Sequence, residues 1–423
     1  LTFIIANMMK KIPRNLSRNV LNALNHTPVV FVNGPRQAGK STMVQMIAKK
    51  DFPSEYITFD RVTHMVAAST SPHSFLSEYG QPLILDEVQM VPEIFRALKI
   101  VIDELRLDNT QSKNGHYLLT GSANIMILPK LSDSLVGRMS IKTLYPFSAC
   151  ELLDGEGDFV ERLFSCDFSI QKKLQTSVND ALQLATFPEI SGKQWKERAE
   201  WFDGYLMTIL QRDVRMISEL EKISLLPTLL RTLATRTGGL LNDAEISRDV
   251  ALNQVTSKNY RCILQAMFLT FNIQPWYRNI GKRLVKSPKG YLTDTLLLCH
   301  LLDWKMDDLR KHQPNLYGRV IENFVATELI KILSFSEGRE QLLHFRTGDG
   351  KEVDFVLERP DGSLVAIEVK TSDTITPSDF KGMKVLQSVA PNDFKCGIVL
   401  YSGKHVVPFG NMFFAVPIDR LWR

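Results

Sequence analysis

The sequence has few of the features that mark several common classes of protein. Its five cysteines among 423 residues are scattered, and no two of them form a CxxC pair. This argues against a disulfide framework and against a zinc ribbon. We expect all five to be small buried side chains in a cytoplasmic protein. The longest apolar run, near Leu296, is too short to cross a bilayer, so we predict no membrane segment.

The chain also lacks a strong excess of charge of either sign. A net charge of +5 over this length permits nucleic acid as a partner but does not require one. At the N-terminus, the short apolar stretch precedes its two lysines and has no small-residue cleavage site. We therefore predict no signal peptide there.

Four segments differ in their hydrophobic pattern and give the expected domain organisation. Residues 1–150 alternate short apolar runs with helical patterns, which indicates a parallel sheet covered by helices. Residues 151–235 are mostly helical, and residues 236–310 follow the order helix, helix, hairpin that is typical of a winged helix. Residues 311–423 begin with a helix, continue with three strands, and end with a helix and a further strand. The sequence thus predicts two α/β units joined by a helical and winged-helix middle.

A glycine-rich motif marks the first unit as a nucleotide-binding domain. Gly34-x-x-x-x-Gly39-Lys40-Ser41 follows a predicted strand and precedes a predicted helix, which is the context of a P-loop. The glycines let backbone N–H groups face the phosphates, Lys40 can reach the β and γ oxygens, and Ser41 can bind Mg²⁺ at the helix N-terminus. The predicted nucleotide-binding residues are Gly34, Pro35, Arg36, Gln37, Ala38, Gly39, Lys40, Ser41 and Thr42.

Two acidic residues end the next predicted strand, LILDE. Asp86 can hold the Mg²⁺ shell, and Glu87 can orient or deprotonate the attacking water. The alternative is a strand that ends in a solvated acidic turn. The strand HYLLTGSAN then places Thr120, Ser122 and Asn124 at the same edge of the sheet, and we choose Ser122 as the γ-phosphate sensor. Arg138 follows, either as a group that neutralises transition-state charge or as a structural arginine.

These motifs resemble those of prokaryotic AAA+ superfamily ATPases that pair an N-terminal ATPase with a C-terminal domain of unknown function. The matching strings are NGPRQAGKST, LILDEVQMVPEIFRALK, LLTGSAN, LVGR with LYPFSACEL, FPEI, YLMTILQRDV, RVIENFVATEL, GKEVDFVLE and IEVK. The resemblance implies ATP rather than GTP, and hydrolysis with Mg²⁺. ATPases of this kind often assemble into homo-oligomers, and a charge-neutralising Arg138 would then act within its own subunit or across an interface. Thr186-Phe187 departs from the Gly-Tyr that is usual in relatives.

A second set of charged residues lies near the C-terminus. Glu368 and Lys370 are two apart in a predicted strand and so point to one side, and Asp354 lies in the neighbouring strand. Asp354 and Glu368 can bind Mg²⁺ or Mn²⁺, and Lys370 can activate a water. This pattern resembles the PD-(D/E)xK nuclease core, in which Glu322 matches the helical acid. The alternative is a solvated face with a cross-strand ion pair.

Basic residues gather in the predicted hairpin and the helix before it. The set is Lys258, Arg261, Arg278, Lys282, Arg283, Lys286 and Lys289, with Trp276 and Tyr277 beside it. A winged helix can place such residues on double-stranded DNA, with salt-sensitive binding. The alternative is an ordinary solvated surface.

Two main hypotheses follow for the whole chain. The first is an ATP-hydrolysing switch coupled to a DNA-directed, metal-dependent nuclease domain. The second is a slowly hydrolysing, nucleotide-gated module that binds DNA or protein through an inactive nuclease-like scaffold. A more remote third reading is a transport or chaperone ATPase.

Overall fold

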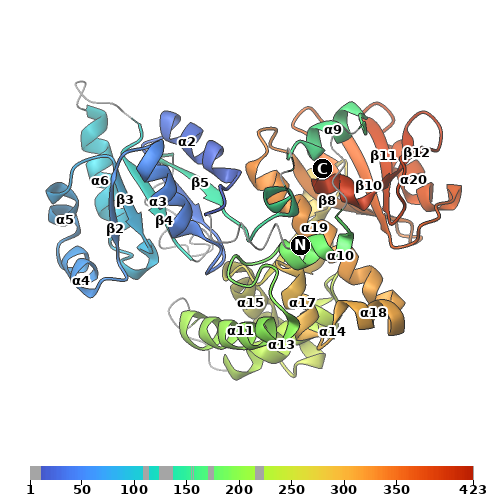
Figure 1. Cartoon of the computed structure of the whole chain (residues 1–423), viewed down its shortest axis with the longest axis horizontal. Coiled ribbons are helices and arrows are strands. Elements are labelled where there is room, and N and C mark those ends of the chain that lie inside the picture. Colours follow the sequence, from blue (N-terminus) through green and yellow to red (C-terminus); the bar gives the residue numbers. More distant parts are fainter. Residues whose placement is uncertain are drawn as a thin grey trace. The chain divides into compact units, whose positions relative to one another are not determined.

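The structure is a computed structural model, and it describes residues 11–107, 114–122, 137–153, 155, 157–169, 176–214 and 223–422. The chain divides into two compact units. The first comprises Leu1–Pro146, Phe187–Glu189 and Gln265–Phe268, and the second comprises Phe147–Thr186, Ile190–Leu264 and Leu269–Arg423. Each unit contains its own sheet (Figure 1).

The first unit is built on a five-stranded sheet. Its strands are β1 (Val29–Asn33), β2 (Glu55–Thr58), β3 (Leu83–Asp86), β4 (Tyr117–Thr120) and β5 (Met139–Thr143). They lie in the order β2-β3-β4-β1-β5, and every neighbouring pair is parallel. The carboxyl ends of all five strands therefore meet at one edge, where a ligand of an α/β sheet binds.

Helices cover this sheet because its central strands are apolar on both faces. The helices are α2 (Leu16–His26), α3 (Lys40–Lys50), α4 (Val62–Thr70), α5 (Pro72–Glu78) and α6 (Ile94–Leu107). Alternate strand residues, such as Phe31, Leu85 and Leu119, share one core with Phe95 and Leu98 of α6. The predicted parallel, helix-covered sheet is confirmed, and the fold is that of an α/β P-loop NTPase.

The second unit contains most of the helices. They are α8 (Ala149–Leu152), α9 (Phe159–Ser165), α10 (Val178–Leu184), α11 (Trp195–Thr208), α13 (Leu226–Thr235), α14 (Asp243–Asp249), α15 (Gln254–Ala266), α17 (Thr295–Leu301) and α18 (Met306–His312). A π-helical turn, Ile209–Asp213, continues α11. In the part of the chain that the structure describes, no helix is long and apolar enough to span a membrane.

An eight-stranded mixed sheet organises the rest of the second unit. Its strands are β6 (Thr270–Pro275), β7 (Lys289–Leu292), β8 (Gln341–Arg346), β9 (Glu352–Glu358), β10 (Leu364–Lys370), β11 (Phe394–Tyr401), β12 (Val407–Pro408) and β13 (Phe413–Pro417). Helices α16 (Ile280–Val285), α19 (Pro314–Phe335) and α20 (Lys381–Val389) belong to the same part of the chain. The order is β12-β13-β11-β10-β9-β8-β6-β7, so the β6–β7 hairpin extends the C-terminal sheet by pairing with β8.

The cysteines differ in part from the expectation. All five are free thiols, as predicted. Cys150, Cys299 and Cys396 are buried, but Cys166 is half-buried and Cys262 is exposed. The expectation that all five are buried is therefore wrong for two of them: Cys166 directly follows α9, and Cys262 lies at an exposed position of α15.

Candidate functional site

The loop between β1 and α3 has a backbone that only glycine tolerates at its two ends. Gly34 has φ +144° and Gly39 has φ +94°, both in the left-handed region. A Cβ atom at Gly34 would lie 2.1 Å from the backbone oxygen of Leu144. The loop therefore lies directly against the end of β5, and its residues Gly34 to Thr42 lead into the N-terminus of α3 as predicted.

Lys40 is buried at the centre of this loop. Its Nζ donates to the backbone oxygens of Gly34, at 3.0 Å, and Pro35, at 2.8 Å. Burial lowers the pKa of Lys40 to about 8, although the nearby carboxylates of Glu87 and Asp86 oppose this shift. The ammonium group thus lies against the backbone of the loop. A phosphate anion bound there would favour the charged form of Lys40.

Asp86, at the end of β3, lies beside the loop hydroxyl. It accepts hydrogen bonds from Ser41 Oγ at 2.9 Å, from Tyr56 Oη at 2.6 Å and from Thr120 Oγ1. A carboxylate and a hydroxyl at this separation are the hard oxygen donors that Mg²⁺ prefers. The residues present therefore fit a magnesium–nucleotide complex. Tyr56 comes from β2, a strand that the sequence did not reveal, and burial together with Asp86 raises its pKa.

Glu87 follows Asp86 in a left-handed conformation, with φ 60° and ψ 45°. Its carboxylate accepts hydrogen bonds from Ser122 Oγ, at 3.3 Å, and from the amide of Gln89. The same amide donates to Ser122 Oγ at 2.9 Å. Gln89 therefore links the predicted water-orienting residue to the predicted sensor, and sequence reasoning missed it even though it lies two positions after Glu87.

Arg14 is a second residue that the sequence did not indicate. It lies before α2 and donates from Nη1 to the backbone oxygen of Ala38, at 2.8 Å, and from Nη2 to that of Tyr145, at 2.7 Å. It thereby ties the phosphate loop to the segment after β5. No sequence signal identifies it, because its partners are backbone atoms far along the chain.

The remaining predicted residue of the first unit has a structural partner. Arg138 donates from Nε to Asp103 Oδ1 of α6, at 2.8 Å, and from Nη2 to Oδ2, at 3.0 Å. Both roles that the sequence allows for Arg138 remain predictions. Asn124 lies outside the described residues.

The predicted C-terminal residues come together in the second unit. Lys370 Nζ lies 2.8 Å from Glu368 Oε1, and the backbone N–H of Asp354 points to Glu368 Oε2 at 3.4 Å. The backbone N–H of Val369 donates to Asp354 Oδ2 at 3.0 Å. Glu322, on α19, lies on the other side of Asp354. These side chains form what we call the carboxylate cluster: Glu322, Asp354, Glu368 and Lys370, with Lys289 and Tyr291.

Lys289 is the member of this cluster that the sequence assigned elsewhere. Its side chain is 2% exposed, and its Nζ lies 3.0 Å from Asp354 Oδ1 and 3.2 Å from Glu322 Oε1. Burial alone would lower the pKa of Lys289, but the carboxylates of Asp354 and Glu322 outweigh it and raise that pKa. Tyr291 Oη donates to Glu322 Oε1 at 2.7 Å. Lys289 and Tyr291 of β7 therefore both contact the carboxylate of Glu322 on α19.

Burial also shifts the pKa values of two acids in the cluster. It raises the pKa of Glu322 to about 7 and that of Glu368 to about 8, with the Asp354 charge as the next cause in each case. Among the residues that the structure describes, no group of three or more His, Cys, Asp or Glu side chains is arranged to hold a metal ion.

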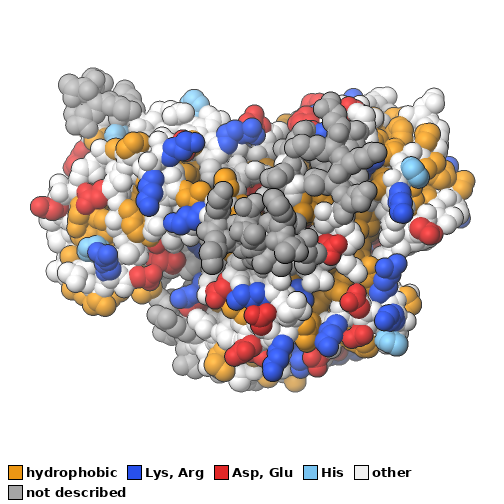
Figure 2. All heavy atoms as spheres, viewed as in Figure 1, with side chains coloured by type: hydrophobic (Ala, Val, Ile, Leu, Met, Phe, Trp, Pro, Cys, Tyr) orange, Lys and Arg blue, Asp and Glu red, His pale blue; other side chains and the backbone are white. Residues whose placement is uncertain are grey.

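The other basic residues near the hairpin divide into two groups. Arg283 is buried and pairs with Glu358, while Arg261 is buried and pairs with Asp243. Trp276 is also buried, and its Nε1 donates to Glu358. The exposed basic residues are Lys258, Arg278, Lys282 and Lys286. On the face shown in Figure 2, the described Lys and Arg side chains are interspersed with Asp and Glu.

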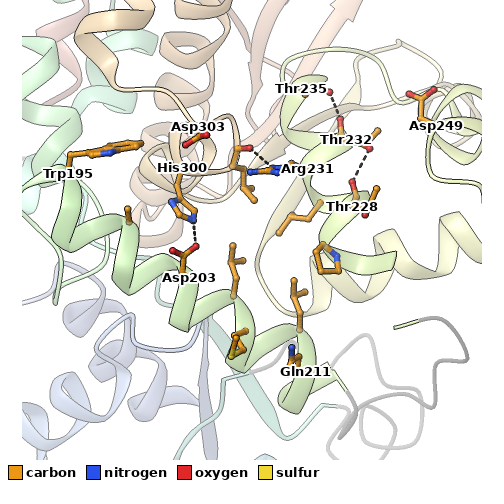
Figure 3. Close-up of a pocket in the computed structure, with 17 residues that line it drawn as sticks. Trp195, Asp203, Gln211, Thr228, Arg231, Thr232, Thr235, Asp249, His300 and Asp303 are labelled. Atoms are coloured by element: carbon orange, nitrogen blue, oxygen red, sulfur yellow. Dashed lines mark hydrogen bonds and ion pairs between the residues drawn. The ribbon is translucent and has the colours of Figure 1, made fainter. Parts of the chain in front are cut away.

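The second unit also has a groove of about 870 Å³ between α11 and α13. Apolar side chains such as Leu206 and Leu210 line it, and Figure 3 shows His300 of α17 directed at Asp203 of α11, a pair 3.1 Å apart. None of its lining residues belongs to the phosphate loop or to the carboxylate cluster.

Comparison with known proteins assigns the parts of the chain separately. Residues 26–153 match the family described as AAA domain, while residues 175–308 and 317–421 match two families described as domains of unknown function, DUF8612 and DUF4143.

The curated relatives include the uncharacterized protein Rv2008c of Mycobacterium tuberculosis, which is 28% identical over 96% of this chain and 84% of its own length. A Haemophilus influenzae protein is 22% identical over 81% and 83%. Among solved structures, the Walker-type ATPase PABY2304 of Pyrococcus abyssi is 14% identical, with a TM-score of 0.42 over 70% of this chain and 99% of its own. The strand order and the loop geometry give the N-terminal part of this chain the fold of a P-loop NTPase, and residues 26–153 within it are similar to the AAA domain.

Proposed function

We propose that this protein binds ATP with Mg²⁺ and hydrolyses it. The phosphate loop from Gly34 to Thr42 surrounds the phosphates with backbone N–H groups, and Lys40 moves its hydrogen bonds from loop carbonyls to phosphate oxygens. Ser41 and Asp86 are the residues that would hold Mg²⁺. Held by these two residues, Mg²⁺ would neutralise part of the negative charge of the phosphates.

The hydrolytic step depends on Glu87. Its carboxylate accepts a hydrogen bond from the attacking water and orients that water towards the γ-phosphorus. Gln89 and Ser122 hold the carboxylate in place, and Ser122 is close enough to Glu87 to register the loss of the γ-phosphate. The observation that carries this proposal is the 2.9 Å contact of Ser41 Oγ with Asp86, directly beside the restrained Glu87.

Phosphate release from ATP tests this proposal in three variants of the full chain. Lys40→Ala is expected to abolish ATP binding, and Glu87→Gln is expected to bind ATP but to lose about 10²–10⁴-fold in turnover. Glu93→Gln is the matched control, because Glu93 is an exposed acid on the same segment. If Glu87→Gln retains the wild-type rate while Lys40→Ala is inactive, another residue orients the water.

For the second unit we propose a nucleotide-gated binding module instead of a metal-dependent nuclease. The observation that favours this choice is the buried Lys289 between Asp354 and Glu322. Incubation of plasmid DNA with Mn²⁺, with and without ATP, is expected to leave it intact. Cleavage that Lys370→Ala abolishes would restore the nuclease hypothesis.

DNA binding and self-association are further proposals for this protein. Lys258, Arg278, Lys282 and Lys286 are the exposed charges that support a DNA contact. A filter-binding titration at increasing salt tests that contact, and light scattering with and without ATP tests assembly. Loss of DNA binding in the quadruple alanine variant would locate the contact.

A further inference from the structure

The carboxylate cluster contains a cation of its own. We propose that the Lys289 ammonium group takes the place of a divalent metal ion between Asp354 and Glu322, so that the cluster binds neither Mg²⁺ nor Mn²⁺. This inference deepens the proposal that the second unit does not cleave DNA, and it is independent of the ATPase proposal.

The position of Lys289 Nζ is the first argument. It bridges carboxylates from two different elements, Asp354 on β9 and Glu322 on α19, at 3.0 and 3.2 Å. These are hydrogen-bond distances to an ammonium group, whereas Mg²⁺ needs oxygens at about 2.0–2.1 Å in an octahedral shell. An ion shared by Asp354 and Glu322 would have to displace the ammonium group.

Three oxygens of the cluster already accept hydrogen bonds or ion pairs from other groups. Asp354 Oδ2 accepts from the backbone N–H of Val369, and Glu368 Oε1 accepts from Lys370. Glu322 Oε1 accepts from Tyr291 as well as from Lys289. A metal ion that takes these oxygens as ligands would compete with charge-assisted hydrogen bonds, which are the stronger kind.

The space around Glu322 is the third argument. A Cβ atom on Gly238 would lie 3.0 Å from both Glu322 carboxylate oxygens, so the main chain packs closely against that acid. Lys289 and Asp354 are 2% and 6% exposed. Mg²⁺ gives up its water reluctantly and usually keeps several water ligands. The dense packing of this side of the cluster opposes a hydrated ion.

Mn²⁺ binding to the nucleotide-free full chain tests this inference, read by electron paramagnetic resonance of the free ion. We expect that Asp354→Asn does not change Mn²⁺ binding in the wild-type background at millimolar Mn²⁺. Asp86→Asn is the parallel control for any ion at the phosphate loop. Binding that Asp354→Asn removes and Asp86→Asn preserves would overturn the inference.

A second variant asks whether the site becomes available when the ammonium group is removed. Lys289→Met removes the ammonium group and shortens the side chain by one atom. It is expected to bind one Mn²⁺, which Lys289→Met combined with Asp354→Asn then loses. Lys286→Met, an exposed neighbour, is the control and is expected to bind none. If folded Lys289→Met also binds no Mn²⁺, Lys289 does not stand in a metal position and the inference fails. If Lys289→Met does not fold, the comparison of wild type with Asp354→Asn decides.

Discussion

The close approach of the phosphate loop to the end of β5 makes Gly34 a sensitive position. In Gly34→Ala, the new methyl group would lie 2.1 Å from the Leu144 carbonyl oxygen, whereas real Cβ contacts essentially never fall below 3.0 Å. The loop or the strand end must therefore move by about 0.9 Å. The φ of +144° adds strain of about 1–3 kcal/mol for a residue with a Cβ atom.

This displacement allows an estimate of the effect on turnover. Groups that act on the γ-phosphate must be positioned closely, and a misplacement of about 1 Å costs about a hundredfold in rate. We therefore expect Gly34→Ala to lose about a hundredfold in kcat/KM for ATP, together with weaker ATP binding. Because Lys40 donates to the Gly34 carbonyl, the shift would also move the ammonium group.

Steady-state phosphate release and titration with a fluorescent ATP analogue measure both effects. Gly80→Ala is the matched control, because no heavy atom lies within 4 Å of a Cβ atom at Gly80. A thermal unfolding scan of both variants separates a local change from loss of the fold. Wild-type turnover in folded Gly34→Ala would refute the reasoning that the loop is held against Leu144.

Three further predictions concern polar side chains with hydrogen bonds inside the fold. Lys331→Met removes three hydrogen bonds of 2.9–3.0 Å and leaves Glu328 buried without its cation. We therefore expect urea denaturation to show that the free energy of unfolding falls by about 3–5 kcal/mol, and a fall below about 1 kcal/mol would contradict this. ATP affinity is expected to fall as pH rises through about 8, because nucleotide-free Lys40 is charged below its lowered pKa and neutral above it. If the ATP affinity does not change across this pH range, the charge of Lys40 is not required for binding. Gln89→Leu is expected to slow turnover about tenfold at unchanged ATP affinity, because Glu87 loses a hydrogen bond to its charge; equal rates would remove Gln89 from the mechanism.

The sequence was sufficient to predict the phosphate loop and the acidic end of the strand beside it, because both depend on local spacing. Gly34, Lys40 and Ser41 lie within one short motif, and Asp86 and Glu87 end one apolar strand. Tyr56 could not be found in this way. Its strand, β2, lies at the edge of the sheet, and only Ile57 among its four residues is buried, so the period-two signal is too short to recognise.

The same limit explains the assignment of Lys289 to a DNA-binding surface. A basic residue in a hairpin has the same local pattern whether it faces solvent or an acid 65 positions away. The pairing of β6 with β8 buries this part of the hairpin, and pairing between distant strands is not visible in local periodicity. The segment expected to be a turn contains the short helix α16, in which Arg283 turns inward to Glu358.

The two charged centres of this chain differ in where their positive charge comes from. In the function that we propose, the centre at Asp86 would take its cation, Mg²⁺, from solution, so a chelator would deplete it. The cation of the centre at Asp354 is the Lys289 side chain, which is part of the chain and cannot dissociate. Treatment with EDTA should therefore stop hydrolysis at the first centre and leave the charges of the second unchanged. The two centres could then be studied separately.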